Sequence, residues 1–92
     1  MNVVVVGGGP AGMIAGITSA EEGNNVILVE KNSSLGNKLK ITGKGRCNLT
    51  FDGDEEKFRN NIVNNSKFMY SSFSNFNNKD VVDFFNKLGV KT

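Results

Sequence analysis

The chain of 92 residues is long enough for one small domain with a thin core. Its 11 basic residues against 9 acidic ones give a net charge of +2, which is too small to indicate a nucleic-acid partner. The chain has no histidine and one cysteine, which excludes a His-based triad, a His-ligated metal, an internal disulfide and a multi-cysteine zinc site. We find no apolar run that could form a transmembrane helix and no signal-peptide pattern, so we expect a cytoplasmic protein without a membrane partner.

The first 30 residues predict a β-α-β unit. Val3 to Val6 and Val26 to Val29 are short, continuous apolar runs, typical of parallel strands that are buried on both faces. Between them, residues 11–22 show a helical pattern that Pro10 can begin and Gly23 ends. The unit should be right-handed. We expect the packed helix face to carry Met13, Ile14 and Ile17, with Gly16 and Ala20 allowing close approach.

The first strand runs directly into a turn, Gly7 to Gly12, that satisfies the G-x-G-x-x-G pattern. In this pattern the first glycine allows the sharp turn, the second lets a pyrophosphate approach the backbone, and the third lets helix and strand pack closely. The following helix directs free N–H groups towards the phosphates. A tight turn without a ligand is the alternative. We expect dinucleotide binding through Gly7, Gly9, Pro10, Ala11 and Gly12.

A single acid, Glu30, ends the second strand. Its distance from Gly12 is close to the roughly 20 residues expected for an acid that binds the ribose of a dinucleotide. A carboxylate that accepts from ribose hydroxyls would repel a 2′-phosphate. We therefore do not expect NADP at this particular site.

Residues 31–51 form a Gly- and Lys-rich segment with no acid. Its cations are Lys31, Lys38, Lys40, Lys44 and Arg46. Because Gly36, Gly43 and Gly45 disfavour regular structure, we predict a loop that emerges beside the phosphate site. Such a loop would favour an anion and let backbone amides reach it. On composition alone, a solvated basic loop is an equal alternative.

Residues 52–92 predict helices. From Asn78, apolar residues recur at helical spacing as far as Gly89, which ends the pattern. A weaker helical pattern precedes it at Met69, Phe73 and Phe76. We expect the phenylalanines of this half to form a core rather than a stacking platform. Residues 90–92 look like the start of a strand, so we expect an incomplete domain and a polypeptide that continues beyond Thr92.

Several stretches of this sequence resemble the BaiN-like flavoproteins, a family of NAD(P)/FAD-dependent oxidoreductases that includes aminoacetone oxidases. They are residues 7–12, Glu30-Lys31, residues 35–39 and, most specifically, residues 42–50, which read T-G-x-G-R-C-N-x-T. Residues 68–90 are also similar. The resemblance spans nearly the whole chain, but only the N-terminal part of the family's longer domain set.

The resemblance implies a Rossmann-like α/β fold that binds FAD, with residues 1–30 as its β-α-β start, 31–51 as the cofactor loop and 52–92 as a mostly helical part. It implies that Gly9, Pro10, Ala11 and Gly12 lie along the pyrophosphate, and that Glu30 and Lys31 hold the adenosine ribose. The residues that would approach the flavin are Lys38, Thr42, Gly43, Gly45, Arg46, Cys47 and Asn48. We expect Cys47 to pack or to touch the flavin rather than to act as a nucleophile, because the chain has no histidine to activate it.

The function implied by the resemblance is that of the N-terminal FAD-binding segment of a flavin-dependent oxidoreductase. NADH and NADPH are the candidate electron donors, and the substrate is a small molecule that the sequence does not identify. We expect the 92 residues alone to be inactive, because hydride transfer needs residues on both faces of the flavin ring. Two alternatives stay open: a fumarate-reductase-like flavoprotein, and a non-catalytic or vestigial nucleotide-binding module.

Overall fold

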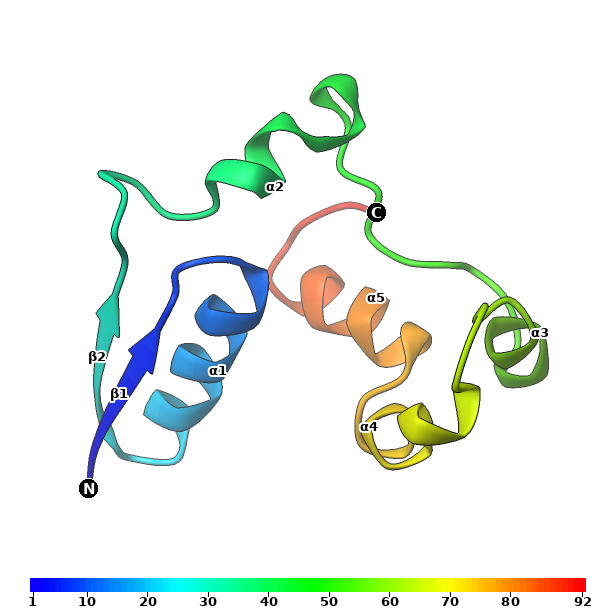
Figure 1. Cartoon of the computed structure of the whole chain (residues 1–92), viewed down its shortest axis with the longest axis horizontal. Helices are drawn as coiled ribbons and strands as arrows, with labels where there is room; N and C mark the ends of the chain where they lie inside the picture. Colours follow the sequence, from blue (N-terminus) through cyan, green and yellow to red (C-terminus); the bar gives the residue numbers. More distant parts are fainter. The chain divides into compact units, whose positions relative to one another are not determined.

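The computed structural model describes residues 1–92, which form two compact units (Figure 1). Unit 1 is Met1–Asn48 and unit 2 is Leu49–Thr92. Unit 1 contains β1 (Asn2–Val6), α1 (Pro10–Glu21), β2 (Asn25–Val29), α2 (Asn37–Ile41) and a 3₁₀ turn, η1 (Thr42–Gly45). Unit 2 contains α3 (Glu55–Asn60), a 3₁₀ turn η2 (Ser66–Met69), α4 (Tyr70–Asn75) and α5 (Asn78–Lys87). No helix is long and apolar enough to cross a lipid bilayer.

The strands of unit 1 form a two-stranded parallel sheet. The register runs from the pair Asn2 and Asn25 to the pair Val6 and Val29, so the two strands end together. Helix α1 connects them and lies along one face of the sheet (Figure 1). This arrangement confirms the predicted Rossmann-like β-α-β start.

The sheet is covered on one face only. Val5 and Val26 lie beneath α1, whereas Val4 and Ile27, on the opposite face, are each 60% exposed. The prediction that both strands are buried on both faces is therefore wrong for this chain. The physical reason is that α1 is the helix that packs on this sheet, and no described element of unit 1 covers the other face.

Helix α1 approaches the sheet through its small residues. A Cβ atom at Gly16 would lie 3.6 Å from a methyl group of Val26, which is ordinary van der Waals contact. The helix therefore lies close to the strand at this turn. Ile14 and Ile17, predicted to pack together with Met13, are instead 38% and 44% exposed, so that part of the prediction is wrong. Ala20, expected to allow close approach, is also exposed.

The basic segment is less irregular than predicted, because it contains α2 and η1. Its glycines interrupt the helical turns instead of abolishing them. Gly36, at φ 67°, precedes α2, while Gly43 and Gly45 adopt φ 66° and 87° at the end of the segment. Lys44 also lies in the left-handed region, at φ 49°, where a side chain is unfavourable. The prediction of a loop throughout is thus corrected to the short helix α2 and the turn η1, with left-handed residues before α2 and within η1.

Unit 2 confirms the helix predicted from Asn78. A capping box precedes α5: Asn77 accepts from the backbone N–H of Asp80 at 2.9 Å, and Asp80 accepts from that of Asn77 at 2.9 Å. The weaker pattern before it corresponds to η2 and α4. Residues 90–92 form no strand, contrary to the prediction, because a strand needs a neighbouring strand with which to pair and these residues pair with neither β1 nor β2.

The phenylalanines of unit 2 pack only in part. Phe73 is 7% exposed, and its ring stacks on that of Phe58 with 4.7 Å between centroids. Phe84 and Phe85 meet edge to face at 5.2 Å. The predicted core therefore exists, but Phe68 is 85% exposed and stands outside it.

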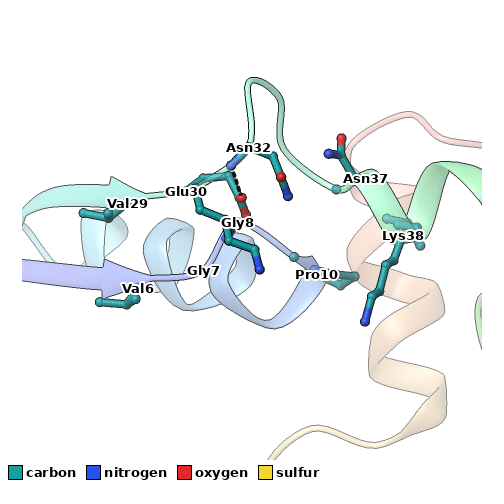
Figure 2. A pocket seen from close by; sticks show the side chains of 13 residues that line it. Val6, Gly7, Gly8, Pro10, Val29, Glu30, Asn32, Asn37 and Lys38 are labelled. Carbon is teal, nitrogen blue, oxygen red and sulfur yellow. Dashed lines mark hydrogen bonds between the residues drawn. The ribbon is translucent and has the colours of Figure 1, made fainter.

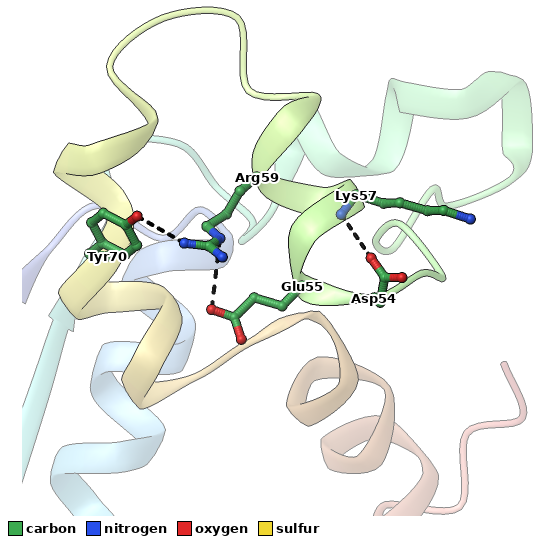
Figure 3. A network of polar contacts seen from close by, with 5 residues as sticks. All are labelled: Asp54, Glu55, Lys57, Arg59 and Tyr70. Carbon is green, nitrogen blue, oxygen red and sulfur yellow. Dashed lines mark hydrogen bonds and ion pairs between the residues drawn. The ribbon is translucent and has the colours of Figure 1, made fainter.

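Polar contacts define the two ends of α3 (Figure 3). The carboxylate of Asp54 accepts from the backbone N–H of Lys57 at 2.8 Å and caps the first turn. One turn later, Arg59 donates to the Tyr70 hydroxyl at 2.9 Å and lies 3.8 Å from the carboxylate of Glu55. Exposed pairs of this kind contribute at most about 1 kcal/mol each, so they orient the helix more than they stabilise the unit.

Candidate functional site

Unit 1 contains a cavity of about 490 Å³ at the carboxyl ends of the two strands. The glycine turn and the start of α1 form one wall, the end of β2 forms another, and the start of α2 forms a third (Figure 2). In open α/β sheets, ligands bind outside the carboxyl ends of the strands. The cavity is lined by Val6, Gly7, Gly8, Gly9, Pro10, Val29, Glu30, Lys31, Asn32, Gly36, Asn37, Lys38 and Leu39.

The glycines of the turn serve different purposes. Gly7 adopts φ 105°, a conformation that favours glycine, and this turns the chain out of β1. A Cβ atom at Gly12 would overlap the carbonyl oxygen of Gly7, so only glycine allows α1 to begin this close to the strand. A Cβ atom at Gly9 would meet nothing within 4 Å. The chain itself thus leaves open the space beside Gly9, which faces the cavity.

The carboxylate of Glu30 is held by two backbone groups (Figure 2). One oxygen accepts from the N–H of Gly8 at 2.9 Å, and the other accepts from the N–H of Asn32 at 2.7 Å. The hydrogen bond from Asn32, followed by that from Gly8, lowers the pKa of Glu30 below its ordinary value of 4.5. Glu30 is therefore a fixed, ionised acceptor at the edge of the cavity.

Gly8 joins three segments of unit 1. Its N–H donates to Glu30 at the end of β2, and its carbonyl oxygen accepts from the N–H of Gly36 at 2.8 Å. Gly8 and Gly36 are both buried. A Cβ atom at Gly8 would lie 3.1 Å from the Glu30 carboxylate, so a larger residue would disturb the contact that orients this acid.

The structure brings together part of the predicted site. Of the predicted residues, Gly7, Gly9, Pro10, Glu30, Lys31 and Lys38 line the cavity. Ala11 and Gly12 lie in the first turn of α1, behind the lining. The remaining predicted residues are exposed and do not line this cavity, namely Thr42, Gly43, Gly45, Arg46, Cys47 and Asn48.

Sequence reasoning missed several lining residues. The G-x-G-x-x-G pattern does not predict Gly8, because it leaves this position free, although the Gly8 backbone makes two of the hydrogen bonds that organise the cavity. Asn32 was missed because its contribution to Glu30 comes from the backbone. The other missed residues are Val6, Val29, Gly36, Asn37 and Leu39. Three of them, Gly36, Asn37 and Leu39, are close neighbours of Lys38 in the sequence, and this proximity is the signal that could predict them.

A parallel strand pair, a connecting helix, a glycine turn and an acid at the tip of the second strand define a Rossmann-type α/β domain. The chain belongs to the family described as the HI0933-like protein Rossmann domain, whose model matches residues 1–92. This match confirms the resemblance to the BaiN-like flavoprotein family and the Rossmann-like fold class.

The comparisons with curated proteins add two relatives that are similar over nearly the whole chain. The 3-dehydro-bile acid delta(4,6)-reductase of Clostridium scindens is 30% identical over 98 residues, which cover 96% of this chain and 22% of the relative. The ribosomal RNA dihydrouridine synthase of Escherichia coli is 29% identical over 89 residues, which cover 97% of this chain and 22% of the relative. The chain thus spans about a fifth of the length of these two proteins.

A third relative is similar over a shorter stretch. The NADH oxidase of Thermoanaerobacter brockii is 64% identical over 39 residues, which cover 42% of this chain and 6% of the relative. The names of these relatives place the family among the oxidoreductases.

Proposed function

We propose that this chain is the FAD-binding segment of a flavin-dependent oxidoreductase, and that its cavity holds the adenosine and pyrophosphate part of the cofactor. The observation that carries the proposal is the carboxylate of Glu30, fixed at the tip of β2 by the N–H groups of Gly8 and Asn32. A fixed, ionised acceptor beside a glycine turn is the arrangement that the ribose of a dinucleotide needs.

The residues present fit such a group. A carboxylate offers about four acceptor positions, and the two backbone N–H groups use only part of this capacity. The remaining acceptor positions of Glu30 suit the two neighbouring hydroxyls of a ribose. The open space beside Gly9 suits a pyrophosphate, because even a Cβ atom at this position would meet no atom of the chain within 4 Å.

In this proposal Gly7, Gly9, Pro10, Ala11 and Gly12 follow the pyrophosphate, and Lys31 supports Glu30 at the ribose. Lys38 and the residues from Thr42 to Asn48 extend towards the flavin. The bound FAD would supply hydride transfer, while the chain binds and orients the cofactor. The acid at position 30 disfavours a 2′-phosphate, so NADPH could serve as a donor only at another site.

The comparisons support the reaction class but not a substrate. The names of the relatives include a reductase and an oxidase, which agrees with redox chemistry. Two of the names refer to a bile acid and to ribosomal RNA, which are chemically unrelated. We therefore propose the flavin-dependent class and no particular substrate.

The test is the visible absorption spectrum of the protein purified from its full natural reading frame. We expect a flavin spectrum that survives gel filtration and is bleached by NADH or NADPH, which identifies the donor. The Glu30→Ala variant should weaken FAD binding about ten- to a hundredfold, as expected for a lost hydrogen bond to a charged group. A colourless protein that also fails to take up added FAD would contradict the proposal.

A further inference from the structure

A single buried side chain holds the segment that precedes α3 in unit 2. Asn78, at the start of α5, is 5% exposed, and its NH₂ group donates to the carbonyl oxygens of Phe51 at 2.7 Å and Gly53 at 2.9 Å. An amide NH₂ group has two hydrogens, so these two bonds use both of its donors. The main chain is therefore fixed on both sides of Asp52.

A carboxylate and a backbone N–H without partners lie between these two fixed carbonyl groups. The side chain of Asp52 is exposed and makes no hydrogen bond or ion pair within the chain. The backbone N–H of Gly53 makes no hydrogen bond within the chain either. The carboxyl carbon of an aspartate and the nitrogen of the next residue can join in a five-membered ring. Both groups that would form this ring are thus unoccupied.

The packing of Phe51 requires glycine at position 53. A Cβ atom on Gly53 would overlap the aromatic ring of Phe51, so the ring occupies the place of a side chain. Because glycine has no Cβ atom, its nitrogen is the one that the preceding carboxyl group reaches with least obstruction. The fold therefore demands, directly after Asp52, the residue that makes ring closure easiest.

We propose that the Asp52-Gly53 dipeptide is a site of spontaneous isoaspartate formation, and that Asn78 restrains this reaction in the folded chain. First, the Gly53 nitrogen bonds to the side-chain carboxyl carbon of Asp52, and the amide proton leaves with the carboxyl OH as water. Water then opens the resulting succinimide. Cleavage between the nitrogen and the side-chain carbon regenerates aspartate, whereas cleavage between the nitrogen and the main-chain carbonyl carbon gives isoaspartate. No atom changes its oxidation state, and neither FAD nor an enzyme is needed.

The position of the Asn78 hydrogen bonds explains the restraint. Closing the ring turns the peptide group between Asp52 and Gly53, and this movement is opposed by the bond on each side. The reaction therefore proceeds from a locally opened state, whose population sets the rate. Isoaspartate adds one carbon to the main chain between the two carbonyl groups, so Asn78 can no longer hold both. The modification thus releases the start of α5 from the segment before α3.

The test incubates the full-length protein under native conditions and measures isoaspartate by peptide mapping. We expect it to accumulate at Asp52 but not at Asp54, which precedes a glutamate and whose carboxylate accepts from the N–H of Lys57 at 2.8 Å. Asp52→Glu keeps the charge but would need a larger ring, so the signal should disappear in this variant. Isoaspartate that forms no faster at Asp52 than at Asp54 would overturn the site.

The restraint is tested with two variants of the same helix start. Asn78→Ala should raise the rate of isoaspartate formation at Asp52 about tenfold, as expected when buried hydrogen bonds that hold the reactive segment are lost. Asp80→Ala is the matched control for lost stability, because it removes the bond to the N–H of Asn77 and leaves both bonds of Asn78 in place. Equal rates in Asn78→Ala and the unmodified protein, or equal acceleration by both variants, refute the restraint.

The unmodified protein provides a measurement that does not depend on whether Asn78→Ala folds. In urea that unfolds the chain, both Asn78 bonds are absent, so isoaspartate should form at Asp52 faster than in the native protein. The same rate in the folded and the unfolded chain refutes the restraint.

Discussion

At the scale of the residue, Gly9 and Gly12 differ in what surrounds them, and alanine substitutions should separate folding from ligand binding. Gly12→Ala would drive a methyl group into the carbonyl oxygen of Gly7, so we expect a loss of about 1–3 kcal/mol in the free energy of unfolding. Gly9→Ala meets no atom of the chain and should leave stability unchanged, yet abolish most of the FAD affinity. Urea unfolding and FAD titration of both variants check this. Equal stability of the two would contradict the packing argument.

Glu30 should make the stability of the ligand-free protein depend on pH. Its pKa is lower in the folded chain than its ordinary value of 4.5, because Asn32 and Gly8 donate to the carboxylate. Its stabilising contribution is therefore complete above pH 4.5 and is lost as the pH falls through the lowered pKa. We expect the advantage over Glu30→Gln in urea unfolding to be constant well above pH 4.5 and to shrink as the pH falls below that value. An advantage that stays constant with pH would show that the charge does not matter.

At the scale of the element, Asn78 ties the start of α5 to the chain before α3. Its side chain is 5% exposed, and its NH₂ group donates to the carbonyl oxygens of Phe51 at 2.7 Å and Gly53 at 2.9 Å. Asn78→Ala leaves both carbonyls without this partner, so we expect a loss of about 1–3 kcal/mol in stability.

The matched control for this substitution is Asn61→Ala, whose side chain makes a similar bond to Lys57 on the surface. Because water replaces that bond, the loss should stay below about 0.5 kcal/mol. Similar losses for both variants would mean that burial of Asn78 does not carry the effect.

The elements that could be predicted from the sequence are those with local signals. The turn at Gly7 to Gly12, the two apolar runs and the capped helix from Asn78 each carry their own pattern within a few residues. The short helix α2 could not be predicted, because a glycine such as Gly36 disfavours helical structure. In the protein, Gly36 adopts a left-handed conformation and forms the N-cap of α2. The exposure of Ile14 depends on what packs against α1, which no local pattern contains.

The candidate site shows the same division. Glu30 and the glycines could be predicted because their spacing follows from one β-α-β unit. Gly8 and Asn32 could not, since they act through backbone groups that any residue possesses. Asn37 could not be predicted either, because its place on the cavity wall depends on the fold of α2.

At the scale of the whole molecule, the uncovered face of the sheet in unit 1 should govern how this 92-residue chain behaves by itself. Val4 and Ile27 are each 60% exposed on that face. Large exposed apolar patches bind hydrophobic dyes, so we expect the isolated chain to enhance the fluorescence of such a dye. The double variant Val4→Thr, Ile27→Thr should reduce this signal and preserve the strands, because threonine keeps the β-branched shape.

Val5→Thr is the control for this comparison, because Val5 lies beneath α1 on the covered face. Burying a hydroxyl there should destabilise unit 1 by about 1–3 kcal/mol and raise the dye signal. A double variant with an unchanged dye signal would show that the uncovered sheet face is not the surface that the dye detects.

The two hydrogen bonds of Gly8 have a consequence for spectroscopy. Its amide proton is donated to the carboxylate of Glu30, which follows β2, and its carbonyl oxygen accepts the amide proton of Gly36, which precedes α2. Both hydrogen bonds involve Gly8, but they lead to different walls of the cavity. The amide resonances of Gly8 and Gly36 in an NMR spectrum would therefore report on these two walls separately. A ligand that bridges these walls should shift both signals with the same titration midpoint, whereas a ligand confined to one wall should move only one of them.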